Sequence, residues 1–275
     1  MLQITIVTYK TTLNKCESLN SLCKYIDKLE VPYSILIVNN SPEIQLEDSP
    51  LYTIFTPTEN LMLAKAYNAA LSIAKKNGHE WMMLLDQDTT LTEDYIVGLN
   101  NALKSKIDTS IAAIVPVVKY IDGIHQISPA TYNPTFGTVN AKMLKPCIVS
   151  SKSVLAINSC SVVRITAIES IGGFPEMFPL DGLDTAYYYQ FYKHGWDVQV
   201  IDAVIFQNLS VFDYKHNMSD RRYQSILKSE LDLVHIMGTT ATITLKLKYL
   251  GRIVIQLFDS GKRRYVKQTA AALLK

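Results

Sequence analysis

Short apolar runs rich in β-branched residues alternate with longer runs that have the apolar spacing of amphipathic helices. The pattern predicts strands at 3–8, 34–38, 52–55, 81–85 and 111–118, and helices at 13–29, 61–76 and 92–103. Strands alternating with helices imply crossover connections and a mostly parallel sheet with helices on both faces. Because both faces of such a sheet are covered, a strand such as 81–85 can be apolar at every position. The predicted fold class is therefore α/β.

The second half of the chain has a weaker pattern. We expect loops and edge strands over 120–151, helices at 166–171, 184–194 and 219–237, and a strand at 198–206. No linker divides the chain before about residue 240. We therefore expect one domain over 1–240, with a nucleotide-binding half over about 1–118 and an acceptor half over about 119–240. An amphipathic basic helical segment, 241–275, follows.

The last thirty residues differ from the rest in charge. The 275-residue chain carries +2, from 27 Lys and Arg against 25 Asp and Glu, which argues against a dedicated nucleic-acid surface. From Lys246 to Lys275 there are eight basic residues and one acid, so this segment carries +7 and the remainder −5. Two interpretations stay open for it: a helix pair packed on the domain with a solvated charged face, or attachment to an anionic membrane surface.

The cysteines and the lengths of the apolar runs indicate the cellular compartment in which the protein is expected. The four cysteines show no C-x-x-C pair and no metal-ligand spacing, and Cys16 and Cys23 are seven residues apart, as on one helix face. No signal-peptide pattern precedes the first strand, and no apolar run approaches the roughly 18 residues that span a bilayer. We expect a cytoplasmic protein, with peripheral contact at the inner face of the membrane as the alternative for its tail.

Polar residues follow three of the predicted strands, where ligands bind in open α/β sheets. These residues are Thr8 and Tyr9, then Asn39 and Asn40, and then Asp86 and Asp88. Residues two apart at a strand end point to the same side, so Asp86 and Asp88 can face one ligand. With a substrate diphosphate, two such carboxylates suit Mg²⁺ or Mn²⁺. The alternative for so short a pattern is that Asp88 caps the next turn and Asp86 is solvated.

Other nucleotide and metal signatures are missing from the sequence. No G-x-G-x-x-G follows the first strand, and neither G-x-x-x-x-G-K-[ST] nor H-E-x-x-H occurs. The dinucleotide-binding, P-loop and zinc-protease classes are therefore poorly supported.

A second acidic pair, Asp181 and Asp184, stands where the helix 184–194 begins. Acids suit the positive end of a helix dipole, so capping alone would explain one of them. The functional interpretation makes one aspartate a general base for an acceptor hydroxyl.

Five stretches in chain order resemble motifs of family-two glycosyltransferases of the GT-A type. They are ITIVTYK, IVNNS, ENLMLAKAYNAAL, LLDQDT and GGFPEMFPLDGLDTAYYYQFYKHGW. The resemblance covers about residues 3–240, and LLDQDT resembles the bacterial rhamnosyltransferase branch in particular. It implies a GT-A fold and an inverting, hexosyltransferase-type enzyme that uses a nucleotide-diphosphate sugar and Mg²⁺ or Mn²⁺.

The resemblance also implies roles for individual residues. Asp88 would ligate the metal, Asp86 would reach the donor ribose or sugar, and Asp184 would be the general base, with Asp181 as the other acidic candidate. The residues expected to hold the nucleotide and diphosphate are Thr8, Tyr9, Asn39, Asn40, Asn60 and Lys65. Ser159 and Cys160 would line the sugar side.

Several positions depart from the family pattern. Asn39 replaces the usual Asp, so that a contact with the base would use an uncharged amide. Met62 and Cys160 replace glycines, and Ala186 replaces the Glu of D-T-E.

The most informative departure is Gln207, which replaces a His that can be the third protein contact of the metal. A glutamine carbonyl ligates a hard cation more weakly, and His216, nine residues further on, is the other candidate.

These observations predict transfer of a sugar, with L-rhamnose from dTDP-rhamnose favoured, to a bacterial surface polysaccharide or a lipid-linked glycan. The alternatives are a UDP-hexose or UDP-galactofuranose donor, or a catalytically weakened domain that binds glycans within a synthase complex. The acceptor, the linkage and the oligomeric state stay open.

Overall fold

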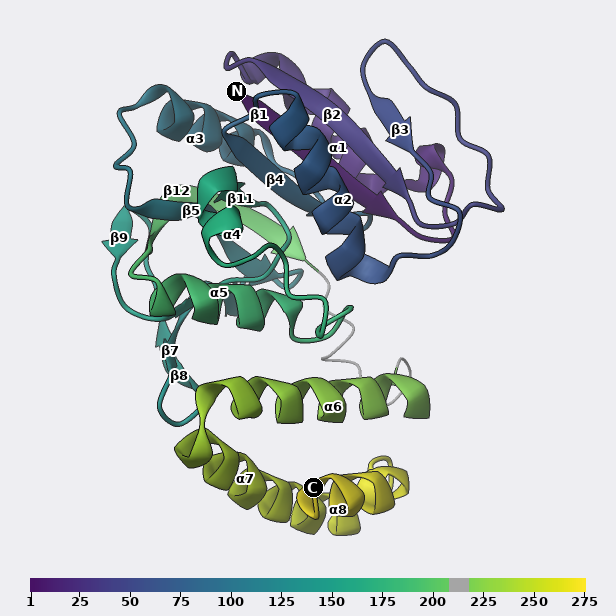
Figure 1. Ribbon diagram of the computed structural model, residues 1–275, viewed down its shortest axis with the longest axis vertical. Coiled ribbons are helices and arrows are strands. Elements are labelled where there is room, and N and C mark those ends of the chain that lie inside the picture. The colour runs from purple at the N-terminus through teal and green to yellow at the C-terminus, as the bar shows by residue number, and fades with distance from the viewer. Residues whose placement is uncertain (208–217) are drawn as a thin grey trace. The chain divides into compact units, whose positions relative to one another are not determined.

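The computed structural model describes residues 1–207 and 218–275, which divide into two compact units (Figure 1). The first comprises Met1–Thr131 and Ala141–Gln207. The second comprises Tyr132–Asn140 and the described residues from 218 onward. We expected a boundary near residue 240, whereas the helix that begins at Asp220 already belongs to the second unit.

A mixed sheet forms the centre of the first unit. Among the described residues its strand order is β3-β2-β1-β4-β11-β5-β12-β9, with β6 paired to β5. The strands are β1 Leu2–Thr8, β2 Tyr33–Asn39, β3 Thr53–Phe55, β4 Trp81–Asp86, β5 Ile111–Tyr120, β6 Gln126–Ser128, β9 Ile148–Ser150, β11 Ser161–Arg164 and β12 Asp197–Gln207. Strands β1 to β4 pair in parallel, as do β5 and β12. The predicted α/β class with a mostly parallel sheet is confirmed.

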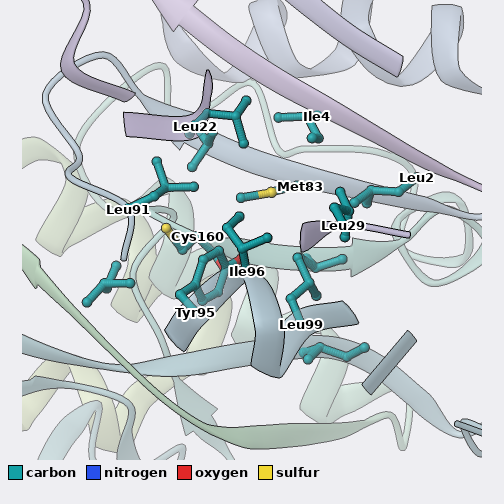
Figure 2. Packing of buried hydrophobic residues seen from close by; sticks show 14 of the residues in the cluster. Leu2, Ile4, Leu22, Leu29, Met83, Leu91, Tyr95, Ile96, Leu99 and Cys160 are labelled. Carbon is teal, nitrogen blue, oxygen red and sulfur yellow. The ribbon is translucent and has the colours of Figure 1, made fainter. Parts of the chain in front are cut away.

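Two helices, α1 Glu17–Tyr25 and α3 Glu93–Lys104, supply apolar residues to the core on one face of the sheet. Figure 2 shows Leu22 from α1 near Ile4 and Met83 of the strands, and Tyr95 from α3 near Cys160. Successive strand residues point to opposite faces, so this core takes alternate residues of β1.

The other helices of this unit are α2 Met62–Lys76, α4 Ile165–Ser170 and α5 Leu183–Lys193. From the opposite face of β1, Gln3 Nε2 donates to the carbonyl of Ala70 on α2 at 2.9 Å. Three aromatic rings pack in sequence: Tyr67 of α2 lies 5.2 Å from Phe174, and Phe174 lies 5.5 Å from Tyr187 of α5. Phe174 therefore links α2 to α5.

Two local predictions differ from the structure. The helix expected over 13–29 is divided into α1 and flanking 3₁₀ turns at Leu13–Lys15 and Ile26–Lys28. Strand β11 was not predicted; it lies antiparallel between β4 and β5 in the middle of the sheet. It has only four residues, too few for a periodic pattern. The loops and edge strands expected over 120–151 contain β7 Ala130–Asn133 and β8 Thr138–Met143, which form a small sheet with β10 Val154–Leu155.

The second unit contains helices α6 Asp220–Met237, α7 Thr239–Phe258 and α8 Val266–Leu273. Its apolar core includes Tyr223, Leu245 and Tyr249. A half-buried ion pair joins α6 to α7, since Arg252 Nη2 lies 2.7 Å from Glu230 Oε1. In the part of the chain that is described, no helix combines the length and the apolar character needed to cross a membrane.

Candidate active site

The carboxyl ends of β1, β2 and β4 lie side by side. In the parallel register Thr8 pairs with Asn39, and Val7 pairs with Asp86. The polar residues that follow these strands in the sequence are thereby brought to one edge of the sheet, as predicted from the open α/β rule.

A chain of hydrogen bonds holds Asp86 from the neighbouring strands. Ser159 Oγ donates to Asp86 Oδ2 at 2.8 Å, and Gln207 Nε2 donates to Ser159 Oγ at 2.8 Å. Ser159 lies in the turn before β11, and Gln207 is the last residue of β12. The order of the strands therefore joins three segments that are far apart in the sequence.

Burial and neighbouring carboxylates raise the pKa of Asp86 and of Asp184 at this edge. Burial raises the pKa of Asp86 to about 6, while the hydrogen bond from Ser159 opposes this and the negative charges of Asp88 and Asp184 add to it. Burial also raises the pKa of Asp184, and the nearby Asp181 adds to the increase. Both residues are partly exposed as a whole, so it is the carboxyl groups that are enclosed. Asp88, in contrast, is exposed.

Asp184 lies in the first turn of α5, and its Oδ1 accepts a hydrogen bond from the backbone N–H of Thr185 at 2.7 Å. The residue at the N-cap of this helix is Gly182, with φ 77°, so neither Asp181 nor Asp184 is its N-cap residue. The loop before α5 is fixed to α2, because the carbonyl of Pro179 accepts from the N–H groups of Leu63 and Ala64 at 2.8 and 3.2 Å.

The buried polar atoms without a hydrogen-bond partner in the described part of the chain include the hydroxyl of Tyr67 and Oε1 of Gln207, which lie near Asp86. Burial raises the pKa of Tyr67 well above its usual value, and the charges of Asp86 and Asp184 add to the increase. An interaction of the Tyr67 hydroxyl with the Asp86 carboxyl contributes as well, although its geometry falls short of a full hydrogen bond. A buried polar atom without a partner is costly, so both atoms are suited to a ligand.

This donor set fits a divalent cation. The Gln207 carbonyl oxygen and the Asp88 carboxylate are hard oxygen donors, the type that Mg²⁺ and Mn²⁺ take. Within the described ranges, no group of three or more His, Cys, Asp and Glu side chains is arranged to hold a metal. A cation here would therefore depend on substrate phosphate oxygens and water for its remaining ligands. The other predicted ligand, His216, lies outside the described residues.

The polar residues after β1 and β2 are engaged mainly within the protein. The amide of Asn39 donates to the carbonyl of Ile44 at 2.8 Å and accepts from the N–H of Ser41 at 3.1 Å. The amide of Asn40 donates to the carbonyl of Met62 and accepts from the N–H of Leu61. These bonds shape the loop after β2 and the start of α2, while direct contact of Asn39 with a base stays a prediction.

The other predicted nucleotide-binding residues differ in exposure. Thr8 is buried and its hydroxyl donates to the carbonyl of Val38 at 3.4 Å, whereas Tyr9 is 45% exposed. Asn60 and Lys65 are exposed at the start of α2, where Asn60 Oδ1 accepts from the N–H of Met62 at 2.8 Å. Tyr9, Asn60 and Lys65 therefore leave side-chain surface for a ligand.

Cys160 does not face the sugar side as we predicted, because its thiol is fully buried in the apolar core (Figure 2). The backbone at Cys160 has φ 62°, and Met62 has φ 58°. The resemblance has glycine at both positions, and glycine is the residue that adopts this left-handed region without steric cost. The backbone conformation thus persists in spite of the substitutions.

Asn68 and Tyr67 were not predicted as site residues. Asn68 Oδ1 accepts from the N–H of Phe174 at 2.8 Å, and its Nδ2 donates to the carbonyl of Phe174 at 2.9 Å. A Cβ at Gly173, where φ is 94°, would lie 3.0 Å from Asn68 Oδ1, so this turn requires glycine. The signal was in the sequence, since Asn68 lies within the stretch ENLMLAKAYNAAL that resembles the glycosyltransferase motif. Tyr67 had no such signal.

Comparisons with known proteins agree with the fold. No protein-family model matches the chain, and no curated protein sequence matches it. Among solved structures, it is similar to the mannosyltransferase PcManGT from Pyrobaculum calidifontis in complex with GDP-Man and Mn²⁺. The TM-score is 0.54 at 15% identity, over 99% of this chain and 84% of that one.

Two further structures show the same likeness. GalNAc-T7 with UDP, GalNAc and Mn²⁺ has a TM-score of 0.53 at 11% identity, over 76% of this chain and 43% of that one. TarS from S. aureus has a TM-score of 0.50 at 13% identity, over 89% and 70%. At these identities the likeness establishes the fold, which is the GT-A type that the sequence motifs predicted.

Proposed function

We propose that the protein is an inverting, metal-assisted glycosyltransferase that moves a sugar from a nucleotide-diphosphate donor to an acceptor hydroxyl. The observation that carries this proposal is the gathering of Asp86, Asp88 and Asp184 at the carboxyl edge of a GT-A sheet, where the charges of Asp88 and Asp184 raise the pKa of Asp86. Ordinary folding gives no reason to collect three carboxylates beside two unpartnered polar atoms.

Asp184 is proposed as the general base. Burial raises its pKa and so makes its carboxylate a stronger base. Since Thr185 donates to Oδ1, Oδ2 is the oxygen that takes the proton of the acceptor hydroxyl. The acceptor oxygen bonds to the anomeric carbon while the bond from that carbon to the diphosphate oxygen breaks on the opposite side. Attack from the opposite side inverts the configuration at this carbon.

The donor side is proposed to lie at Asp86, Asp88, Gln207 and Tyr67. Asp88 and the Gln207 carbonyl would hold Mg²⁺ or Mn²⁺, whose chemistry when bound is to neutralise charge on the departing diphosphate. Asp86, oriented by Ser159, accepts hydrogen bonds from the donor ribose or sugar. The Tyr67 hydroxyl, which has no partner among the described residues, donates to the donor.

Within this proposal the donor is dTDP-L-rhamnose, because LLDQDT resembles the rhamnosyltransferase branch. The acceptor is a bacterial surface polysaccharide or a lipid-linked glycan. A UDP-hexose or UDP-galactofuranose is the alternative donor. A second candidate function is a glycan-binding subunit of a synthase complex. It is favoured by Asn39, the expected contact of the nucleotide base, because its amide is already paired within the protein.

Thermal shift with a panel of nucleotide sugars, each with Mg²⁺ or Mn²⁺, tests the proposal. We expect one donor to raise the unfolding midpoint and to release its nucleoside diphosphate, and we expect chelation of the metal to abolish both effects. Asp88→Asn should weaken this metal dependence, whereas Asp122→Asn, in a loop beside His125, should not. If no donor binds or is consumed, the enzyme proposal fails. Binding of glycans without binding of any nucleotide would support the scaffold function instead.

A further inference from the structure

Helix α7 carries apolar side chains on two opposite faces. Leu245 and Tyr249 lie in the core of the second unit, which α6 and α8 complete. On the other side a stripe of apolar side chains is 50–86% exposed: Ile243, Leu247, Leu250, Val254 and Phe258. Steps of three and four residues place them along one line of the helix. A contiguous apolar patch of this kind on the surface indicates an interaction site.

The charged side chains that α7 itself carries are all basic. Lys246 precedes and Lys248 follows Leu247, and at about 100° per residue they lie on either side of the stripe. Helix α7 contains no Asp or Glu, and the only acid from 239 to 275 is Asp259. Arg252 belongs to the fold through its pair with Glu230, so Lys246 and Lys248 are the charges that α7 offers to a partner.

Two occupants fit an exposed apolar stripe: a second copy of the chain and a lipid surface. Pairing of two α7 stripes would bring Lys246 and Lys248 of both copies together, and α7 has no acid to compensate them. Like charges in an interface oppose association. A membrane with anionic headgroups has the complementary charge, together with an apolar layer just beneath it.

We propose that the outward face of α7 lies flat on an anionic lipid surface, with the apolar stripe in the headgroup region and Lys246 and Lys248 against the headgroups. The core side of α7 stays bound to α6 and α8, so attachment requires no unfolding. The proposal concerns where the protein is held and does not depend on the sugar-transfer reaction.

Vesicle co-sedimentation of the full chain tests it, with phosphatidylcholine alone or mixed with phosphatidylglycerol. We expect binding to the mixed vesicles, weakened by salt. Leu247→Gln combined with Val254→Gln should reduce binding at least about ten-fold, and Lys246→Gln combined with Lys248→Gln should reduce it several-fold. Ile124→Gln, which changes a 78% exposed apolar residue in the first unit, should leave binding unchanged. Point variants are preferable to truncation, because removing α7 would open the core around Tyr223.

Circular dichroism and the unfolding midpoint check that each variant is folded. The proposal is overturned if the wild-type protein ignores the mixed vesicles, or if the stripe variant is folded and binds them as well as the wild type. It is also overturned if light scattering shows a dimer that the stripe variant alone disrupts while vesicle binding is absent. That last result would assign the stripe to a second copy.

Discussion

The carboxyl edge of the sheet and the outward face of α7 depart from ordinary folding in opposite ways. At the edge, Asp86 and Asp184 are enclosed close to one another, and two buried polar atoms have no described partner. On α7, apolar residues up to 86% exposed face solvent. Buried charge and exposed apolar surface each cost free energy. Under the two proposals above, both regions are completed by something outside the chain, a charged polar ligand in one case and a lipid surface in the other.

The largest expected effect is on the reaction at the edge. Asp184→Asn removes the proposed base and should lower transfer by about 10²- to 10⁴-fold. Its unfolding midpoint should not fall, because one of several like charges is removed. Asp181→Asn is the matched control and should retain most activity. Product formation and thermal unfolding measure both, and loss in the Asp181 variant alone would move the base to that residue.

Two neighbouring leucines compare the two faces of α7 directly. Leu245→Ala creates a cavity in the core and should lower the free energy of unfolding by about 2–5 kcal/mol. Leu247→Ala, at a position 63% exposed, should change it by less than about 0.5 kcal/mol. Urea unfolding followed by circular dichroism gives both values. Equal losses would mean that the outward face is covered within the chain.

Two tyrosine variants test whether the hydroxyl of Tyr67, at the carboxyl edge of the sheet, binds the donor. Tyr67→Phe removes a buried hydroxyl without a described partner, so stability should hold or rise by about 1 kcal/mol while donor binding weakens about ten-fold. Tyr187→Phe removes a hydroxyl that donates to Asn158 Oδ1 at 3.1 Å, and should cost about 1 kcal/mol with little effect on the donor. Unfolding and donor titration distinguish the two. Unchanged donor binding by Tyr67→Phe would remove this residue from the site.

The smallest effect is expected at His79, a buried polar group that has partners in the protein. Its Nε2 lies 2.9 Å from Ser34 Oγ, and burial lowers its pKa. The unfolded chain therefore takes up the proton first, and stability should decrease as the pH falls below about 6.5. His79→Gln should reduce this slope in urea titrations at several pH values. If stability falls with pH as steeply in the variant as in the wild type, the loss of stability at acid pH is due to other groups.

Met62 and Cys160, which stand where the family motifs have glycine, show what a local sequence motif can predict and what it cannot. The motif comparison noted Met62 and Cys160 as departures, and the structure finds left-handed backbone at both. The conformation was therefore implied by the sequence, but the direction of the Cys160 side chain was not. Its thiol enters the core because β11 lies between β4 and β5, and no local signal announced that strand.

The sequence by itself determined the α/β class, the mostly parallel sheet and the edge at which Asp86 and Asp88 lie. These depend on apolar periodicity and on the polar residues that end each strand, which are local properties. Only the tertiary structure decided that Ser159, 73 positions from Asp86, holds that carboxylate, and that Gln207 holds Ser159. It also decided which face of α7 stays exposed. The physical reason is that both outcomes depend on which distant segments pair and pack, and periodicity along a single segment does not specify its partners.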